Sequence, residues 1–416
     1  MFKLRDYQKK GGEDVCKLLQ TLKVAVLVWQ PRCGKTLAAL EGANLYGAKN
    51  VLFVTKKIAI KSIEGDYKKA EYKFYLKVIN YESLHLVNED YDLIIADECH
   101  TLSSFPKPAE RTKLLKTICN GKPVILVSAT ITPESYSQVY HEFFISSFSP
   151  FAEYSNFYKW AKDFVNVKKR YVFNRELNDY SNAKEIEIKK IIGKYLITRT
   201  QKESGFNQEI DEKVLPIEMN KSTYWLANKI LKDRVHIAKD GAEVIADTEV
   251  KLKQKLHQIF SGTVKCEDGT IKIFDTSKAE FIKQYFVGKK IAIFYQYIGE
   301  GEMIKSVFKN TTNSPEIFNE RNDLVFISQI QAGREGVNLA TADCLVMFNI
   351  GYSSVSYQQA KERIQDKNRT KSANLYWVFT TGGIEYKIYE VVKNKLDYSL
   401  KWFKKDFGIQ SKKQTP

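Results

Sequence analysis

Two series of short apolar segments, separated by stretches with helical spacing, restrict what this 416-residue chain can fold into. Most of these segments are rich in β-branched residues and apolar on both faces, which is typical of strands buried inside a parallel sheet. The first series comprises residues 24–29, 51–55, 78–80, 92–97 and 123–130, and the second comprises residues 291–295, 324–328, 344–349 and 375–379. The alternation predicts two α/β units, each a doubly wound sheet that collects ligands at the carboxyl ends of its strands.

The region between the two series is different, because it is rich in aromatic and charged residues. Segments 147–164 and 183–196 have the spacing of amphipathic helices, so we predict a helical insertion whose aromatic residues pack in a core rather than stack on bases. The polar stretch 200–216 ends in proline and is the favoured linker. We expect an N-terminal domain over residues 1–200 with a partly helical extension from 131, a linker over 201–216, and a C-terminal domain over 217–416 with a basic C-terminal helix.

The charge balance favours a polyanionic partner. Lys and Arg together number 65 against 49 Asp and Glu, which gives a formal net charge of +16. Lysine and arginine neutralise phosphates and release the counterions condensed on nucleic acid. A basic but unspecialised surface explains the same excess equally well. The 44% hydrophobic and 27% charged residues are typical of a globular chain.

Cysteine usage and the N-terminus predict a cytoplasmic protein. The six cysteines form no C-x-x-C pair and no cluster with metal-ligand spacing, which favours reduced thiols. The start, MFKLRDYQKK, has no apolar segment after its positive charges, as a signal peptide would require. The apolar runs are too short to cross a membrane, so we expect no membrane partner.

The stretch WQPRCGKT, residues 29–36, ends like a phosphate-binding loop and begins unlike one, because Trp29 stands where a glycine is usual. Such a loop works because backbone N–H groups surround an anion at a helix N-terminus, a lysine adds charge and a hydroxyl binds Mg²⁺. Gly34, Lys35 and Thr36 supply that core between a buried strand and a helical stretch. A chance tripeptide in a turn is the alternative, and it leaves the later motifs unexplained.

A second polar motif, YDLIIADECH, ends the strand predicted over residues 92–97. This position suits Asp97 to hold Mg²⁺ through water and Glu98 to polarise an attacking water. Solvated loop carboxylates are the alternative, but the pair falls at the same sheet edge as the phosphate loop. The next strand ends in Ser128 and Thr130, whose hydroxyls can hydrogen-bond the acids.

In this order GKT, DECH and SAT resemble the motifs of superfamily-two helicases and translocases. Segments 195–203, 255–262 and 276–286 are similar to the Swi/Snf-like branch. The resemblance extends over nearly the whole chain, but it is strong only in separate short segments. It implies two RecA-like domains, with ATP and Mg²⁺ as cofactors. It also implies that ATP lies between the two domains, and that their closing and opening moves the nucleic acid.

The resemblance assigns roles to further residues of the N-terminal half. LRDYQKKG, residues 4–11, looks like the family's adenine-sensing segment, in which the Gln8 amide pairs with the base edge and Arg5 and Tyr7 lie nearby. His100 is implied to couple the acids to the second domain, together with Ser128 and Thr130. A metal ligand is the alternative for His100, but no partner lies at ligand spacing. Cys99 is interpreted as a small buried filler.

Nucleic-acid contacts are implied after strands of both domains. Thr55, Lys56 and Lys57 match the strand-gripping segment of the first domain, with a solvated turn as the alternative for the two lysines. Residues 327–340 resemble the fifth motif, in which glycines let backbone amides approach phosphates. The residues predicted there are Ser328 and Gly333 for nucleic acid, and Gly336 and Asn338 for the nucleotide.

The phosphate loop departs from the family pattern. Trp29 and Arg32 replace frequent glycines and Pro31 stiffens the loop. The cradle is expected to survive, because the later backbone amides and Lys35 remain. We therefore keep Pro31, Arg32 and Cys33 among the predicted nucleotide contacts.

The sixth motif, residues 356–370, departs further. Gln359 and Arg363 fit the pattern Q-x-x-x-R-x-x-R, but Asp366 holds the place of the last arginine and cannot replace it chemically. We predict Arg363 as an arginine of the nucleotide cleft and Arg369 as the finger that reaches the γ-phosphate. Lys367 is the alternative to Arg369.

These motifs predict a nucleic-acid-dependent ATPase that translocates on DNA or unwinds it. We expect it to act as a monomer on duplex or branched DNA, with replication or recombination proteins as partners. Its compactness resembles the minimal members of bacteriophage or prophage replication modules. Three alternatives stay open: an RNA helicase, a catalytically weak nucleic-acid-binding protein that keeps the fold, or the engine subunit of a larger nuclease or defence assembly.

Overall fold

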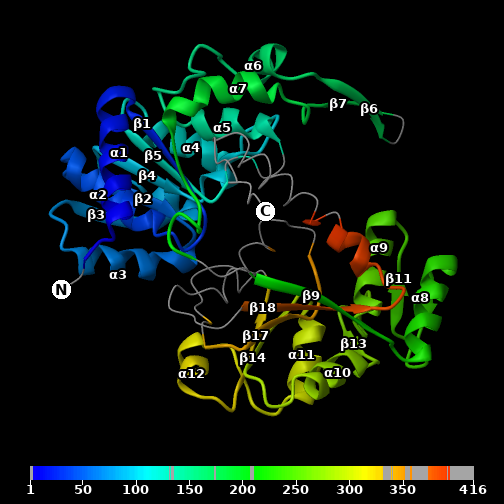
Figure 1. Ribbon diagram of the computed structural model, residues 1–416. Helices are drawn as coiled ribbons and strands as arrows, with labels where there is room; N and C mark the ends of the chain where they lie inside the picture. Colours follow the sequence, from blue (N-terminus) through cyan, green and yellow to red (C-terminus); the bar gives the residue numbers. More distant parts are fainter. Residues whose placement is uncertain are drawn as a thin grey trace, which may run out of the picture. The chain divides into compact units, whose positions relative to one another are not determined.

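The computed structural model describes residues 3–130, 132, 135–172, 175–206, 210–330, 339, 341–351, 357, 373–390 and 392–393. These residues form two compact units, which are described separately (Figure 1). In the described part of the chain, the boundary between the two units falls between Gly205 and Phe206. None of the helices in these ranges is both long enough and apolar enough to cross a membrane.

The first unit contains a six-stranded parallel sheet with the order β3-β2-β4-β5-β1-β8. Its strands are β1 (Val24–Trp29), β2 (Asn50–Thr55), β3 (Tyr75–Asn80), β4 (Leu93–Asp97), β5 (Val124–Ser128) and β8 (Leu196–Arg199). The first five lie on the five segments predicted for this half of the chain. The sixth, β8, begins at the last residue of a segment predicted to be helical, and it pairs with β1.

Helices cover both faces of this sheet, which explains why its strands are apolar on both sides. One cluster joins Leu27, Phe53 and Ile95 to the helices α1 (Asp6–Leu22), α2 (Lys35–Tyr46) and α3 (Ile60–Ala70) (Figure 1). The alternate strand residues, such as Val26 and Val54, join a second cluster on the other face. That cluster includes the helices α4 (Glu110–Ile118), α5 (Val139–Phe143), α6 (Phe157–Phe164) and α7 (Glu185–Ile192).

The aromatic segment that follows β5 packs in this second cluster, so its predicted role in a core is confirmed. The ring of Trp160, for example, lies 5.6 Å from that of Phe157 and 5.3 Å from that of Tyr140. The helix is shorter than predicted, because turns occupy the residues around Pro150 and Asn156 caps α6 by accepting a hydrogen bond from Lys159 N. An antiparallel hairpin, β6 (Lys168–Val172) and β7 (Arg175–Asp179), was not predicted.

Short 3₁₀ helices carry the chain away from several strand ends of the first unit. They are η1 (Lys57–Ala59), η2 (Tyr81–Leu86), η3 (Cys99–Leu102), η4 (Tyr136–Gln138) and η5 (Gly193–Tyr195). Three of them, η1, η2 and η3, begin within two residues of the ends of β2, β3 and β4. The carboxyl ends of β2 and β4 carry predicted site residues, as do those of β1 and β5.

The second unit contains another six-stranded parallel sheet, with the order β15-β16-β14-β17-β18-β9. Its strands are β9 (Ile210–Ile217), β14 (Ile291–Tyr295), β15 (Thr311–Thr312), β16 (Val325–Gln329), β17 (Cys344–Met347) and β18 (Ala373–Thr380). The four predicted strands of this half are all present. The predicted fold class is therefore confirmed: two RecA-like parallel-sheet domains with a largely helical segment between them.

The predicted linker over residues 201–216 is wrong in its second half, because residues 210–216 belong to β9. β9 pairs with β18 along its whole length and lies at the edge of the sheet, where Pro216 is tolerated. Its Glu212 accepts hydrogen bonds from Tyr357 Oη, Trp377 Nε1 and Tyr389 Oη at 2.6, 2.7 and 2.8 Å. A polar strand of this kind does not show the apolar pattern of the buried strands.

Helices also cover both faces of the second sheet. α10 (Ser277–Tyr285) and α11 (Ile298–Val307) pack on one face, and α12 (Pro315–Glu320) packs on the other. A satellite core follows β9 in the chain. It comprises α8 (Lys221–Asp233), α9 (Glu249–Ile259) and the hairpins β10 (Val235–Ile237)–β11 (Glu243–Ile245) and β12 (Thr263–Lys265)–β13 (Ile271–Ile273). The satellite is joined to the sheet by Thr380 Oγ1, which donates to Phe260 O at 2.6 Å. The predicted basic C-terminal helix is described only as far as residue 393.

Candidate nucleotide site

The end of β1 leads directly into the predicted phosphate loop, and α2 begins at Lys35. Gly34 has φ +79°, a left-handed conformation that favours glycine. A Cβ built on Gly34 would lie 2.0 Å from Gln8 Nε2, so the buried Gln8 side chain packs directly on the loop. The structure therefore brings the predicted adenine-sensing residue and the phosphate loop together. The left-handed backbone and the close approach of Gln8 both explain why residue 34 is a glycine.

Trp29, which replaces the expected glycine, lies in the core rather than in the loop. Its side chain is 1% exposed, and a Cβ on Gly11 of α1 would lie 2.5 Å from its ring. The Tyr7 ring packs at a tilt against Trp29, with 6.1 Å between ring centroids. The unusual tryptophan is thus accommodated because the facing helix carries glycine at the contact.

The first residues of α1 form a small hydrogen-bonded group beside the loop. Arg5 Nη1 donates to Tyr7 Oη at 2.9 Å, and Arg5 N donates to Gln8 Oε1 at 2.9 Å. The second bond orients the Gln8 amide, because its oxygen is held by the backbone and its nitrogen is directed toward Gly34. Arg5, Tyr7 and Gln8 therefore lie together, as predicted.

The middle of the phosphate loop is compact. Arg32 has φ +63°, so it adopts a left-handed conformation although it is not a glycine. Cys33 is buried, and its N–H donates to Gln30 O at 3.3 Å. Pro31 is only partly exposed, and its carbonyl accepts a hydrogen bond from a residue far along the chain, Gln201. The loop is thus held by contacts that its own sequence does not reveal.

Asp97 ends β4 and is almost fully buried, with 7% of its surface exposed. Its Oδ2 accepts a hydrogen bond from Thr55 Oγ1 at 2.9 Å, while its Oδ1 has no hydrogen-bond partner among the described residues. Burial and the neighbouring charge of Glu98 raise the pKa of Asp97 to about 6, and Lys35 and Thr55 act against that shift. The carboxylate therefore lies within electrostatic reach of the phosphate-loop lysine.

Glu98 and the predicted coupling residues form a continuous chain of contacts. Glu98 has φ +52°, and its Oε2 lies 3.2 Å from His100 Nδ1. The same nitrogen lies 3.0 Å from Ser128 Oγ, whose single hydrogen is donated to Thr130 O at 2.6 Å. Because that hydrogen is already used, His100 Nδ1 carries the proton in the contact with Ser128 Oγ, which accepts it. The acids at the end of β4 are thus connected to the end of β5.

The side chain of Thr55 faces the acids. It is fully buried and donates to Asp97, and the predicted contact of residue 55 with nucleic acid is not tested. Lys56 follows at the N-cap of η1, and Lys57 is exposed. The two lysines lie at the same sheet edge as Asp97 and keep their predicted contact with nucleic acid as a proposal.

Some residues of this site escaped the sequence analysis. Tyr81 Oη donates to Asp97 O at 2.6 Å from a fully buried position, and its only signal in the sequence is an aromatic residue directly after a strand. Gln30, Arg199 and Gln201 support the phosphate loop; they lie in the segments 29–36 and 195–203 quoted above, but no role was predicted for them. Their contacts depend on the pairing of β1 with β8.

The structure describes few of the site residues predicted in the second unit. Ser328 lies in β16, and its hydroxyl donates to Gln329 O at 3.3 Å. The other predicted residues lie outside the described ranges; they are Gly333, Gly336, Asn338, Gln359, Arg363 and Arg369. Their predicted roles are not tested.

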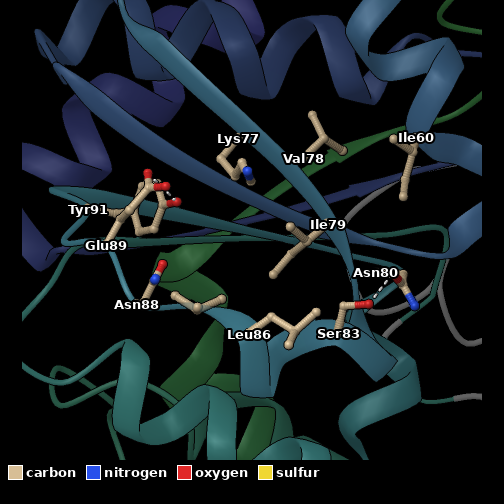
Figure 2. A pocket seen from close by; sticks show the side chains of 11 residues that line it. Ile60, Lys77, Val78, Ile79, Asn80, Ser83, Leu86, Asn88, Glu89 and Tyr91 are labelled. Carbon is tan, nitrogen blue, oxygen red and sulfur yellow. Dashed lines mark hydrogen bonds between the residues drawn. The ribbon is translucent and has the colours of Figure 1, made fainter.

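A separate pocket of about 290 Å³ lies along β3 and η2 of the first unit (Figure 2). Its lining mixes aliphatic and polar side chains, with Ile79 and Leu86 facing across it, and it includes Lys77. Two hydrogen bonds brace its rim, from Ser83 Oγ to Asn80 Oδ1 and from Tyr91 Oη to Glu89 Oε2. None of the predicted nucleotide-site residues lines this pocket. The described residues also contain no group of three or more His, Cys, Asp or Glu side chains that could hold a metal ion.

No protein-family model matches the chain. Among curated proteins, an uncharacterized ATP-dependent helicase of Mycoplasma genitalium is 22% identical over 275 residues, which cover 59% of this chain and 26% of that protein. The ATP-dependent helicase FUN30 of Saccharomyces cerevisiae is 34% identical over 80 residues, covering 19% and 7%. The protein CHROMATIN REMODELING 4 of Arabidopsis thaliana is 19% identical over 382 residues, covering 81% and 16%.

The chain spans about a quarter or less of the length of these relatives. A solved structure, the SWI2/SNF2 ATPase core domain of Sulfolobus solfataricus, covers 97% of this chain and 90% of its own, with a TM-score of 0.43 and 16% identity. The sequence similarity to proteins named as ATP-dependent helicases and as a chromatin-remodelling protein agrees with the predicted resemblance to superfamily-two helicases. The roles of the DECH residues and the phage-type assignment stay predictions.

Proposed function

We propose that the chain is an ATPase that couples ATP hydrolysis to movement along DNA or to separation of its strands. One observation carries this proposal: the buried carboxylate of Asp97, next to Glu98, lies within electrostatic reach of Lys35, where the phosphate loop meets α2. A buried carboxylate raises the free energy of the folded chain unless a cation pairs with it. An acid in such a position at the end of a parallel strand therefore favours a ligand-binding site. The similarity to ATP-dependent helicases supports the same conclusion.

The described residues fit ATP and Mg²⁺. Mg²⁺ prefers oxygen ligands, keeps several waters, and usually binds through one or two carboxylates together with substrate phosphates. Asp97 Oδ1 is a buried carboxylate oxygen without a hydrogen-bond partner in the described part of the chain, and Thr36 lies in the first turn of α2. Asp97 and Thr36 would hold the metal, which supplies charge neutralisation at the phosphates. Arg5, Tyr7 and Gln8 would hold the base.

Lys35, Glu98 and His100 have different roles in the proposed hydrolysis. Lys35 stands at the N-terminus of the 12-residue helix α2, where the helix dipole and the backbone N–H groups add to its positive charge toward phosphate. Glu98 accepts the proton of the attacking water. His100 Nδ1 lies 3.2 Å from Glu98 Oε2 and 3.0 Å from Ser128 Oγ, so the imidazole stands between the proposed base and the end of β5. A change at the end of β5 would therefore alter the orientation of the base.

DNA is the polyanion that we favour. The net charge of +16 and the lysines after β2, Lys56 and Lys57, suit phosphate contacts. Among the similar proteins is the human chromodomain-helicase-DNA-binding protein 1, which is 34% identical over 74 residues. Replication, recombination or repair is the setting that we propose for this activity.

The decisive experiment measures ATP hydrolysis with duplex DNA, single-stranded DNA and RNA at two salt concentrations. We expect DNA to stimulate turnover and added salt to weaken the stimulation, because phosphate contacts release counterions. Lys35→Ala and Glu98→Gln should abolish both basal and stimulated turnover. The exposed residues Lys61 and Glu64 of α3 provide the matched controls, Lys61→Ala and Glu64→Gln, which should behave like the unmodified protein.

Three outcomes would contradict the proposal in different ways. If only RNA stimulated ATP turnover, the partner would be RNA and the proposal of DNA would be wrong. Unchanged turnover in Lys35→Ala and Glu98→Gln would exclude the ATPase site described above. Nucleic-acid binding without any ATP turnover by the unmodified protein would favour a binding protein that keeps the fold.

A further inference from the structure

The phosphate loop is held from outside by the residues that follow β8. β8 pairs with β1 in parallel, with Arg199 opposite Trp29, so the chain emerges from the sheet beside the loop. Three hydrogen bonds then join the two segments. Gln30 N donates to Arg199 O at 2.9 Å, Gln201 N donates to Gln30 Oε1 at 2.6 Å, and Gln201 Nε2 donates to Pro31 O at 3.1 Å.

The turn that carries Gln201 is itself well fixed. Thr200 N donates to Glu203 Oε2 at 2.7 Å, and Glu203 N donates back to Thr200 Oγ1 at 3.2 Å. Arg199 donates from Nε to Ser204 Oγ at 3.0 Å and from Nη2 to Glu203 O at 2.7 Å. Its guanidinium also lies over the Tyr7 ring, 4.2 Å from the centroid. Gln201 therefore projects from a rigid base, which is what a positioning contact requires.

We propose that Gln201 is a positioning residue that holds the phosphate loop in its nucleotide-binding conformation. This inference rests on the proposed ATPase function. The Gln201 backbone N–H binds the Gln30 side chain, and the Gln201 side chain binds the Pro31 carbonyl, so Gln201 fixes the peptide plane between Pro31 and Arg32. The backbone amides that follow this peptide, up to Gly34, are those expected to face phosphate.

The contact also accounts for the unusual start of the loop. Trp29 is committed to the core against Gly11, and Pro31 has no N–H with which to hold the loop from within. The loop is stabilised instead by hydrogen bonds from Gln201, which lies about 170 positions later in the chain and shortly before Gly205. The conformation of the phosphate loop therefore depends on the segment that leads out of this unit.

The test compares steady-state ATP kinetics of the full chain carrying Gln201→Glu with those of the unmodified protein. Glutamate keeps the length and the backbone N–H of residue 201 but cannot donate to Pro31 O when it is ionised. Loss of one hydrogen bond should raise KM for ATP between about two- and tenfold. We expect kcat to stay within about twofold, because Lys35, Asp97 and Glu98 are not touched. Lys202→Ala, an exposed neighbour in the same turn, is the matched control and should leave both constants unchanged.

A second variant tests the contact from its other side. Gln30→Met removes the acceptor of the Gln201 N–H and should also raise KM. Because both residues hold the same loop, the double variant should raise KM by less than the product of the two single effects. Gln201→Ala should match Gln201→Glu, which excludes an effect of the added negative charge.

The outcomes separate this inference from the proposed function. If Lys35→Ala abolishes turnover but Gln201→Glu and Gln30→Met keep the normal KM, Gln201 does not position the loop. A loss of kcat together with a lowered melting temperature, at unchanged KM, would show a role in folding only, as would failure of both variants to fold. If Lys35→Ala keeps full turnover, the ATPase function itself is wrong, whatever the Gln201 variants show.

Discussion

Asp97→Asn should stabilise the first unit while it removes the proposed ATPase activity. The buried Asp97 carboxylate has one oxygen without a partner among the described residues, and burial and Glu98 raise its pKa to about 6. A raised pKa means that the folded chain carries this negative charge less favourably than the unfolded chain. Asparagine keeps an acceptor for Thr55 Oγ1 and removes the charge. The new amide group is the same at every pH, so the pH dependence of the effect on unfolding isolates the electrostatic part.

The magnitude follows from the shift. The pKa rises from the ordinary value of 3.8 to about 6, and each pKa unit corresponds to about 1.4 kcal/mol, so the shift amounts to about 3 kcal/mol. Below pH 4 the acid is protonated in both states and should resemble asparagine. Between about pH 4 and pH 6 the stability of the unmodified protein falls relative to that of the variant. Above pH 6 the variant should be more stable by about 3 kcal/mol.

Calorimetric or urea unfolding at pH 4.5 and pH 7.5 measures this difference, and the transition of the second unit is an internal reference. Asp90→Asn is the matched control, because Asp90 is exposed and Lys122 lowers its pKa, so this variant should gain no stability at pH 7.5. Mg²⁺ with an ATP analogue should stabilise the unmodified protein more than Asp97→Asn. An advantage of Asp97→Asn that is the same at both pH values, or a less stable variant at pH 7.5, would refute the reasoning.

Three further substitutions test the packing of the two units by urea unfolding. Gly11→Ala should destabilise the first unit by about 1–3 kcal/mol, because the new Cβ would lie 2.5 Å from the Trp29 ring; Gly65→Ala, with nothing within 4 Å of its Cβ, should instead stabilise the chain. Glu212→Leu leaves three donors without their acceptor and should destabilise the second unit by at least about 3 kcal/mol. Lys278→Met leaves the fully buried Glu385 carboxylate without its ammonium partner and should destabilise the second unit by about 3–5 kcal/mol. Adding Glu385→Leu removes the unpaired charge and should restore most of the lost stability.

The strands of both sheets could be predicted because burial on two faces leaves a local signal. β1, β2, β4 and β5 are apolar at nearly every position, since helices cover both sides of the sheet. The acids at the end of β4 could be placed beside the phosphate loop because parallel strands direct their carboxyl ends to one edge. The chain of contacts from Glu98 through His100 to Ser128 follows from the same geometry.

Features that depend on pairing between distant segments could not be predicted. β9 looks like a linker because it is a polar edge strand, and only its pairing with β18 makes it part of the sheet. Thr55 looks like a nucleic-acid contact because it ends a strand next to two lysines, yet the adjacent β4 directs it to Asp97. Gln201 lies in the segment 195–203 that resembles the family, yet the sequence does not indicate its contact with the phosphate loop, because that contact depends on the pairing of β8 with β1.

The order of the first sheet explains why the candidate site needs Ser128 and His100. β5 lies between β1 and β4, so the loop after β1 and the acids after β4 are separated by two strand spacings, about 10 Å. Only residues at the end of β5 can bridge this distance within the sheet. Ser128 contacts His100 from the end of β5, and its register with Val28 of β1 fixes where its hydroxyl stands. A shift of β5 by one residue would turn that hydroxyl to the opposite face and disconnect Glu98 from β5. The proposed catalytic base is therefore oriented by the strand order and the register of the sheet as well as by the motif that contains it.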